Sequence, residues 1–230
     1  MNNVQPKPLW KRVGKRVLHA GIPIPRVLRP VIRALYNLGV LIVECWAFVR
    51  KLFWIEPVVR SVCEHVGSGL RAECLPYMRG KGRLRFGEGV NLSGRSCFYF
   101  LSYMPESPEI QIGNNVFIGN GCTLASARRI EIGDHCLLAP FVRIHDNDGH
   151  PADAEKRRDG QSIGPDDVAE VVIEENVWLG ASCTILKGVR VGANSIVGTG
   201  AVVTSDVPPN SVVAGNPARV VRKGSVNPDG

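Results

Sequence analysis

The segments IGNNVFIGNGCTLA (residues 112–125) and IEENVWLGASCTIL (residues 173–186) decide the fold. In both, an aliphatic residue, usually followed by Gly or Ala, recurs every six residues, and a small or β-branched residue stands four places after it. A period of six fits neither an α-helix nor a flat alternating strand. It fits a coil with three short sides, whose aliphatic side chains point to the axis and whose glycines take the special backbone angles of the corners. Stacked coils of this kind bury one continuous aliphatic core.

The same phase predicts the domain organisation. The aliphatic positions are Ile112, Ile118, Leu124, Ile132, Leu138, Ile173, Leu179, Ile185, Val191, Val197, Val203 and Val213. A less regular first coil is expected over residues 81–103, followed by a short loop that ends at Pro108. The predicted fold is therefore mainly β, a left-handed parallel β-helix over residues 81–223 with an N-terminal helical region over residues 1–80. Residues 224–230 are expected to be a flexible tail.

Charge divides the chain into a basic front and an acidic back. Residues 1–100 contain 17 Lys and Arg against 5 Asp and Glu, whereas residues 101–230 contain 11 against 16. A chain of 230 residues with 44% hydrophobic and 21% charged residues is not disordered or collagen-like. Anionic lipid is the first candidate partner of the basic front, and nucleic acid is the alternative that we do not favour.

The seven cysteines include no Cys-x-x-Cys pair, which is typical of reduced thiols in a cytoplasmic protein. Three of them occupy the small inward position of the repeat and are expected in the core: Cys122, Cys136 and Cys183.

Residues 1–80 lack the repeat and are rich in basic and aromatic side chains. Arg26, Arg29 and Arg33 share one stripe of a predicted helix, and three of the four tryptophans, at positions 10, 46 and 54, lie nearby. Such mixtures suit a lipid headgroup boundary. The alternative is a helical cap over the open end of the β-helix, which such solenoids need. The apolar run over 38–43 is too short to span a bilayer, and no secretory signal is recognisable. We expect a cytoplasmic protein, peripheral to the inner face of the membrane.

The six-residue step breaks decisively between Ile144 and Val171. The intervening segment is polar, is punctuated by Gly and Pro, and begins with HDNDGHP (residues 145–151). Long polar loops on rigid scaffolds usually carry the function. His150 lies between Gly149 and Pro151, and an imidazole that titrates near neutral pH is a natural general base.

Four segments together resemble the hexapeptide acyltransferases: GHP at 149–151, RR at 157–158, VVIEENVWLG at 171–180 and DVPPNSVVAGNPAR at 206–219. The most similar type comprises the maltose, galactoside and xenobiotic O-acetyltransferases and their exopolysaccharide-biosynthesis relatives. The resemblance covers roughly residues 84–223. It implies an O-acetyltransferase that uses acetyl-CoA as co-substrate and needs no metal.

The resemblance also implies catalytic roles for matching residues. His150 would be the base that deprotonates the acceptor hydroxyl, and the backbone N–H of Ala181 would stabilise the oxyanion formed from the thioester carbonyl. The indole of Trp178 would lie beside the pocket that binds the co-substrate, with loop packing as the alternative. In the coenzyme groove, the matching positions are Thr199, Thr204 and Arg219. Relatives commonly have Lys where this chain has Ser205, so a basic residue at 222 or 223 is the candidate for that phosphate contact.

On the acceptor side, the resemblance places Asn120 at a position that orients the sugar. Asp146 and Asp148 have no counterpart in the simplest relatives. Either could hold the tautomer of His150 or accept from acceptor hydroxyls, and we favour Asp148 for the first role and Asp146 for the second.

Three other functions compete with acetyl transfer. A γ-class carbonic anhydrase uses the same fold and has two zinc-binding histidines five residues apart, a spacing that His145 and His150 share. However, no His occurs between 66 and 134 to supply the third ligand, and His135 is expected to point outward. A serine acetyltransferase would need a long Gly-rich loop that is missing here. The third alternative is a non-catalytic scaffold.

The acceptor is expected to be a sugar hydroxyl, with the basic, Trp-rich front favouring a glycolipid or a growing surface polysaccharide. A homotrimer is expected, because a single prism leaves flat sides exposed and the loop over 145–170 has no partner within its own coil.

Overall fold

The computed structural model describes residues 24–224, and the chain divides into two compact units, residues 1–46 and 47–230. A 3-10 turn, η1 (Arg26–Leu28), precedes the helix α2 (Arg29–Arg50), whose side chains are all exposed or partly exposed. Trp10 and the basic residues near it, like the predicted tail after Gly224, lie outside the described residues.

A π-helical turn, η2 (Lys51–Ile55), and the helix α3 (Glu56–Val62) follow in the chain. Ile55 and Val59 are at most 1% exposed and belong to the same buried cluster as the coils. Arg60 ties α3 to the first coil, because its guanidinium donates to the carbonyl of Val66 at 3.1 Å. The end of the helical region therefore packs against the first coil of the β-helix.

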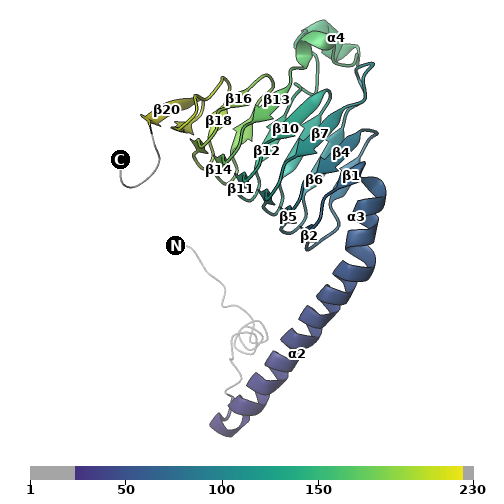
Figure 1. Cartoon of the computed structure of the whole chain (residues 1–230), viewed down its shortest axis with the longest axis vertical. Coiled ribbons are helices and arrows are strands. Elements are labelled where there is room, and N and C mark those ends of the chain that lie inside the picture. The colour runs from purple at the N-terminus through teal and green to yellow at the C-terminus, as the bar shows by residue number, and fades with distance from the viewer. Residues whose placement is uncertain (1–23, 225–230) are drawn as a thin grey trace, which may run out of the picture. The chain divides into compact units, whose positions relative to one another are not determined.

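Three sheets form the sides of the β-helix (Figure 1). Sheet A consists of β1 (His65–Val66), β4 (Arg83–Phe86), β7 (Glu109–Ile112), β10 (Arg129–Ile132), β13 (Val171–Ile173) and β16 (Arg190–Val191). Sheet B consists of β2 (Arg71–Ala72), β5 (Asn91–Leu92), β8 (Phe117–Ile118), β11 (Leu137–Leu138), β14 (Trp178–Leu179), β17 (Ile196–Val197), β19 (Ser211–Gly215) and β20 (Ala218–Lys223). Sheet C consists of β3 (Tyr77–Arg79), β6 (Cys97–Phe100), β9 (Thr123–Ser126), β12 (Arg143–His145), β15 (Thr184–Ile185) and β18 (Val202–Val203). All paired strands are parallel except β19 and β20, which close the structure as an antiparallel pair.

The β-helix begins before the predicted boundary at residue 81. Strands β1, β2 and β3 pair in parallel with β4, β5 and β6 and form one more coil. Val66, Ala72 and Met78 keep the step of six in this coil, but Ala72 and Met78 are not branched aliphatics and have no small residue after them. The coil is therefore recognisable only from its pairing with the next one.

The predicted core is confirmed. All twelve aliphatic positions named above are at most 3% exposed, as are the three cysteines of the small inward position. Burial raises the pKa of the thiols of Cys122 and Cys136 to about 11 and that of Cys183 to about 12. These thiols are core residues and stay protonated at neutral pH.

The glycines that follow the aliphatic residues are required for a different reason than expected. A Cβ on Gly180 would lie 2.7 Å from the backbone nitrogen of Thr199, so the close approach of the next coil excludes a side chain. The left-handed backbone angle occurs two residues later, at Ser182 (φ 58°) in this coil and Gly200 (φ 70°) in the next. The coil thus needs glycine for space and places its positive φ elsewhere.

Candidate active site

The polar excursion between β12 and β13 has its own secondary structure and internal hydrogen bonds. It contains a short helix, α4 (Ala154–Arg158), and a 3-10 turn, η3 (Pro165–Asp167). The carboxylate of Asp153 accepts from the backbone N–H of Glu155 and Lys156, and these bonds lower the pKa of Asp153. Arg157 donates from its guanidinium to two carbonyls near the start of α4. The segment is therefore an ordered part of the structure.

A small second core fixes the excursion to the β-helix. Ile163 and Val168 from the excursion pack with Ala127, which follows β9, and all three are at most 5% exposed. Leu101 and Met104, from the predicted loop before β7, pack against them. The two irregular segments at the corner between sheets C and A thus support each other.

Asp146 anchors the first residues of the excursion. Its carboxylate is fully buried and accepts four hydrogen bonds, from the backbone N–H of Ala127 and Arg128, the hydroxyl of Ser126 and the side-chain amide of Asn147, at 2.6–2.9 Å. Both oxygens are therefore occupied by protein donors. This corrects the expectation that Asp146 binds an acceptor, because a carboxylate without exposed surface cannot reach one.

His150 follows directly from this anchor. The side chain of Asn147 accepts from the N–H of Gly149 at 3.0 Å, and Gly149 has a φ of 73°, so the chain turns sharply before the exposed His150. The carboxylate of Asp148, which we favoured as the orienting group, instead pairs with Nζ of Lys187 at 2.6 Å. In residues 24–224 neither aspartate is bonded to the imidazole of His150.

His145, the last residue of β12, differs sharply from His150. Its side chain is partly buried, and burial, followed by the charge of Arg143, lowers the pKa of His145. The neutral imidazole is therefore favoured there. In the part of the chain that the structure describes, no group of three or more His, Cys, Asp or Glu side chains could hold a metal ion. The described residues thus offer no three-ligand zinc site of the carbonic anhydrase type.

The second group of predicted residues lies at the corner between sheets B and C, hereafter the B–C corner (residues 94–95, 120–121, 140–141, 181–182 and 199–200). Hydrogen bonds from the N–H of Phe141, Ser182 and Gly200 to the preceding coil join the stack. Within residues 24–224 the N–H of Ala181 donates to no other backbone group. Ala181 and Thr199, which precede Ser182 and Gly200, therefore have backbone amides that are free for a ligand. Pro140, which precedes Phe141, has no N–H.

Asn120, Ala181 and Thr199 share this corner, with Ala181 and Thr199 in successive coils and Asn120 two coils before Ala181. Trp178 lies on the adjoining strand β14. The indole of Trp178 is 50% exposed. The side-chain oxygen of Asn120 accepts from the N–H of Arg95 at 2.9 Å, which fixes the side chain and leaves its NH₂ group free to donate to a sugar.

One chain does not bring the two groups together. His150 follows the C-terminal end of a strand of sheet C, at the corner between sheets C and A. Ala181 precedes the N-terminal end of another strand of sheet C, at the B–C corner, so the two residues lie at opposite ends of the strands of this sheet. Figure 1 shows α4 at one side of the β-helix and β11 and β14 at the other.

Sheet B carries an apolar ladder on its outer face. The inward residues of its strands are buried, and the residues beside them, which point outward, are in register from β8 to β19. These outward residues are Phe117, Leu137, Trp178, Ile196 and Val212. Leu137 is 42% exposed in the single chain. A ladder of this kind is a candidate for an interaction surface.

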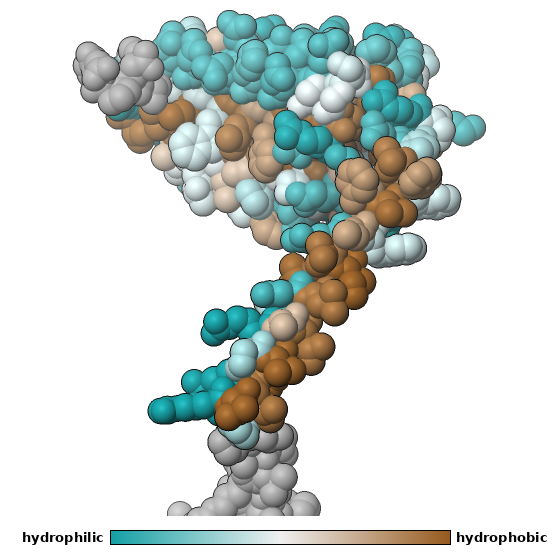
Figure 2. All heavy atoms as spheres, turned by 60° about the horizontal axis from the view of Figure 1, so that its bottom comes forward, coloured by the Kyte–Doolittle hydropathy of each residue, from teal (hydrophilic) through white to brown (hydrophobic). Residues whose placement is uncertain are grey.

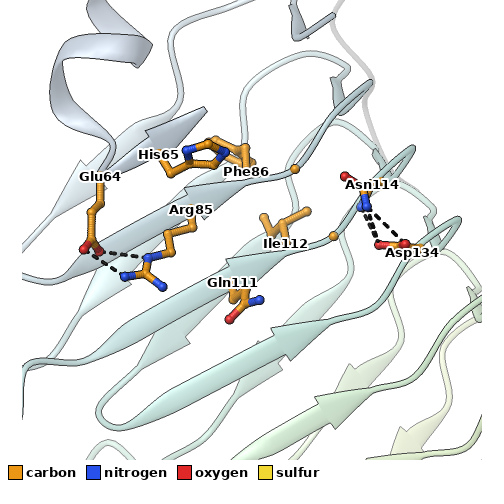
Figure 3. A pocket seen from close by; sticks show the side chains of 10 residues that line it. Glu64, His65, Arg85, Phe86, Gln111, Ile112, Asn114 and Asp134 are labelled. Carbon is orange, nitrogen blue, oxygen red and sulfur yellow. Dashed lines mark hydrogen bonds and ion pairs between the residues drawn. The ribbon is translucent and has the colours of Figure 1, made fainter. Parts of the chain in front are cut away.

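Two hollows lie elsewhere on the β-helix. One, of about 320 Å³ near the C-terminal coils, is lined by both Thr204 and Arg219. The other, of about 560 Å³ on sheet A, contains acidic side chains that already accept hydrogen bonds from neighbouring residues (Figure 3). There Glu64 accepts two bonds from Arg85, and the carboxylate of Asp134 accepts from Asn114. We therefore place no chemistry in the second hollow.

Comparison with known proteins agrees with this geometry. Residues 170–205 match the model of the bacterial transferase hexapeptide (six repeats), and residues 109–139 match that of the hexapeptide repeat of succinyl-transferase. A putative lipopolysaccharide biosynthesis O-acetyl transferase, WbbJ, of Escherichia coli K12 is 32% identical over 159 residues, which cover 64% of this chain and 75% of WbbJ. The galactoside O-acetyltransferase of the same strain is 37% identical over 121 residues, 53% of this chain and 57% of that protein.

Solved structures show the same fold. A hexapeptide-repeat acetyltransferase from Vibrio cholerae in complex with acetyl coenzyme A is 27% identical, with a TM-score of 0.50, over 71% of this chain and 73% of that one. An N-acyltransferase from Bacillus cereus, 15% identical with a TM-score of 0.57 over 73% and 87% of the two chains, is similar in fold alone. The chain spans about three fifths of the length of the galactoside O-acetyltransferases that it matches. On the match to WbbJ and the coils that carry it, the chain belongs to the hexapeptide-repeat acyltransferase family, with the left-handed parallel β-helix fold.

Proposed function

We propose that this protein is an O-acetyltransferase that moves an acetyl group from acetyl-CoA to a sugar hydroxyl in surface polysaccharide or glycolipid synthesis. The observation that carries the proposal is an exposed imidazole, His150, held by a sharp turn beside the buried anchor of Asp146. The choice of a sugar rests on the relatives, two of which are named for galactosides and lipopolysaccharide.

In this mechanism the imidazole of His150 accepts the proton of the acceptor hydroxyl while the hydroxyl oxygen attacks the thioester carbonyl. The tetrahedral oxyanion accepts a hydrogen bond from the free N–H of Ala181. Collapse breaks the carbon–sulfur bond, and the protonated imidazole returns the proton to the leaving thiolate. Thr204 and Arg219 hold the coenzyme, with Arg219 facing its phosphates.

The same mechanism requires more than one chain. His150 and Ala181 lie at opposite ends of the strands of sheet C, so the excursion of one subunit has to meet the B–C corner of another. The apolar ladder of sheet B includes Trp178 and adjoins that corner, which suits an interface there. Cyclic closure with three subunits would give three equivalent sites.

The decisive test is release of free thiol from acetyl-CoA in the presence of a sugar acceptor. His150→Ala should lower the rate at least about 100-fold without loss of fold or of coenzyme binding, because general-base assistance contributes about 10²–10⁴. His145→Ala is the matched control and should cost much less, since that imidazole is partly buried in the face of sheet C. A His150→Ala enzyme with near-normal turnover would refute the mechanism. Equal losses in both variants, with zinc in the wild-type protein, would favour a carbonic anhydrase.

We further propose that α2 holds the enzyme at an anionic membrane surface. Apolar side chains follow one another along α2, with hydrophilic side chains beside them (Figure 2). Leu35, Leu41, Val43, Trp46 and Phe48 are each more than half exposed. In the described residues no helix is both long and apolar enough to cross a bilayer.

The test uses substitutions within the full chain, because deletion of residues 1–80 would also remove strands β1, β2 and β3. Binding to phosphatidylcholine vesicles should increase when phosphatidylglycerol is added and decrease with salt. The double variant Arg29→Gln/Arg33→Gln should weaken the part of vesicle binding that depends on phosphatidylglycerol. Trp46→Ser should weaken the part that remains without it. A full-length protein that ignores anionic vesicles at low salt would leave the helical region with a capping role only.

A further inference from the structure

We propose that the acceptor is an oligosaccharide or glycolipid with a negatively charged group, and that the N-terminal end of the B–C corner binds this group. The inference rests on the proposed acetyl transfer and adds to it the class of acceptor and a second contact, several coils away from the reacting hydroxyl.

The B–C corner is a continuous ridge from Ala181 toward the N-terminal coils. The N–H of Gly121 donates to the carbonyl of Arg95 at 3.0 Å, and Phe141 and Ser182 donate to the two coils that precede them. Phe141 is 56% exposed, and its ring lies over Gly121, since a Cβ there would be 2.5 Å from the ring. An extended ligand that starts at Ala181 would therefore pass an exposed aromatic face and then reach Arg95.

Arg95 ends this ridge on an aromatic platform. Its guanidinium lies 5.6 Å from the ring centre of Tyr77, and the rings of Tyr77 and Tyr99 are 5.8 Å apart on the outer face of sheet C. Tyr77 is 38% exposed. Exposed aromatic faces next to a cation offer an apolar surface for a sugar ring and a charge-assisted donor for an anion.

The acidic side chain of Glu73 at this end accepts from the N–H of Gly94 and the hydroxyl of Ser93, not from an arginine. Among residues 24–224, neither Arg95 nor Arg79 forms an ion pair, whereas on sheet A the neighbouring Arg83 and Arg85 pair with Glu109 and Glu64. The backbone of Arg95 is also tied to the side chain of Asn120, the residue expected to orient the acceptor sugar. An anionic ligand would therefore supply the missing charge and would be aligned with the sugar position.

Three steps between coils separate Arg95 from Ser182, which at a spacing of about 4.8 Å per step amounts to about 14 Å. A single sugar bound at Ala181 cannot bridge this distance. The charged group must therefore lie on a neighbouring sugar or on a lipid-linked phosphate.

The experiment compares four acceptors with the full-length enzyme, using thiol release from acetyl-CoA. They are a neutral monosaccharide, a neutral trisaccharide, the same trisaccharide ending in a uronate and the same trisaccharide ending in a phosphate. For the wild type, KM should be lowest with one of the two anionic trisaccharides, and higher salt should weaken that preference. The anion with the lower KM identifies the source of the charge.

Arg95→Gln should reduce the KM preference for the anionic over the neutral trisaccharide about tenfold, which corresponds to loss of one charge-assisted hydrogen bond. Arg83→Gln, an exposed arginine on sheet A, is the matched control and should leave the ratio unchanged. Tyr77→Ala should raise the KM of all three trisaccharides relative to the monosaccharide. Equal KM values for all trisaccharides, unaffected by Arg95→Gln, would overturn this inference alone. Absence of thiol release with every acceptor would instead overturn the proposed function.

Discussion

Removing the carboxylate of Asp146 tests whether the excursion is held by its anchor. In the variant Asp146→Ala, four donors lose their acceptor: the N–H of Ala127 and Arg128, the hydroxyl of Ser126 and the amide of Asn147. The site is fully buried, so these donors do not simply turn to water.

The expected cost follows from which donors have a second acceptor. The hydroxyl of Ser126 already lies 3.1 Å from the carbonyl of Glu109, and the amide of Asn147 also donates to the carbonyl of Ala125 at 3.0 Å. The two backbone amides have no such alternative. At about 1–3 kcal/mol for each of the two stranded donors, Asp146→Ala should lower the free energy of unfolding by about 2–6 kcal/mol.

The variant Asp146→Asn should cost less. Its amide oxygen can still accept from one pair of donors, and its NH₂ group can donate to the hydroxyl oxygen of Ser126, so that one backbone amide is left unpaired. The expected loss is about 2 kcal/mol. Asp159→Asn, on the exposed part of the excursion, is the control and should change stability by less than about 1 kcal/mol.

Urea unfolding followed by circular dichroism gives these differences, and thiol release gives the effect on catalysis. Because His150 is four residues from the anchor, kcat should decrease in Asp146→Asn under conditions where the protein is still folded. Unchanged stability in both Asp146 variants would refute the conclusion that the Asp146 carboxylate holds the excursion in place. Lower stability with an unchanged kcat would show that the excursion is held by its second core instead.

Three further predictions concern other parts of the molecule. At pH 8 the thiol of Cys45, which is exposed, should react with an alkylating reagent, whereas Cys183 should stay unlabelled by mass spectrometry, because burial raises its pKa to about 12 and removes the thiolate. The hydrogen bond from the backbone N–H of Asn114 lowers the pKa of Asp134, so Asp134→Asn should destabilise the protein by less than about 1 kcal/mol at pH 7, and the loss should become smaller as the pH falls below the ordinary pKa of an aspartate. Chemical denaturation that shows the larger loss in acid would contradict this. Leu137→Glu places a charge in the apolar ladder, so light scattering should give a smaller mass and thiol release should decline; an active variant of unchanged mass would exclude sheet B as the interface.

The repeat predicted the core because its physical cause is local. Every sixth residue has to fill the axis, and a Gly is required wherever the next coil approaches too closely for a Cβ, as at Gly180. Both requirements appear directly in the order of residues. The first coil, with Ala72 and Met78 at inward positions, obeys the same spacing with less typical residues. It was missed because its identity depends on strand pairing with the next coil.

The excursion shows where sequence reasoning ends. Its length, polarity and the position of His150 could be predicted, but Asp146 and Asp148 are separated by one residue and have entirely different surroundings. One is buried beneath backbone amides that follow β9, and the other pairs with Lys187, which follows β15. Those partners are 19 and 39 residues away in the chain, so no local pattern distinguishes the two carboxylates.

The free amide of Ala181 has a structural origin that also explains why this fold suits acyl transfer. Among the described residues of the B–C corner, the N–H groups of Asn120, Ala181 and Thr199 take no part in the hydrogen bonds between coils, whereas Gly94 donates to Glu73 and Pro140 has no N–H. The β-helix therefore presents a row of unpaired donors along one edge, at no extra cost in stability, because they are exposed to solvent. Acyl transfer needs such a fixed donor and a base that can approach it. The N–H groups of the B–C corner do not supply the base. Within one chain the excursion that carries His150 lies at the other ends of the strands of sheet C. The proposed assembly of identical chains would resolve this, because the excursion that is remote from its own row of amides would face the row of a neighbour.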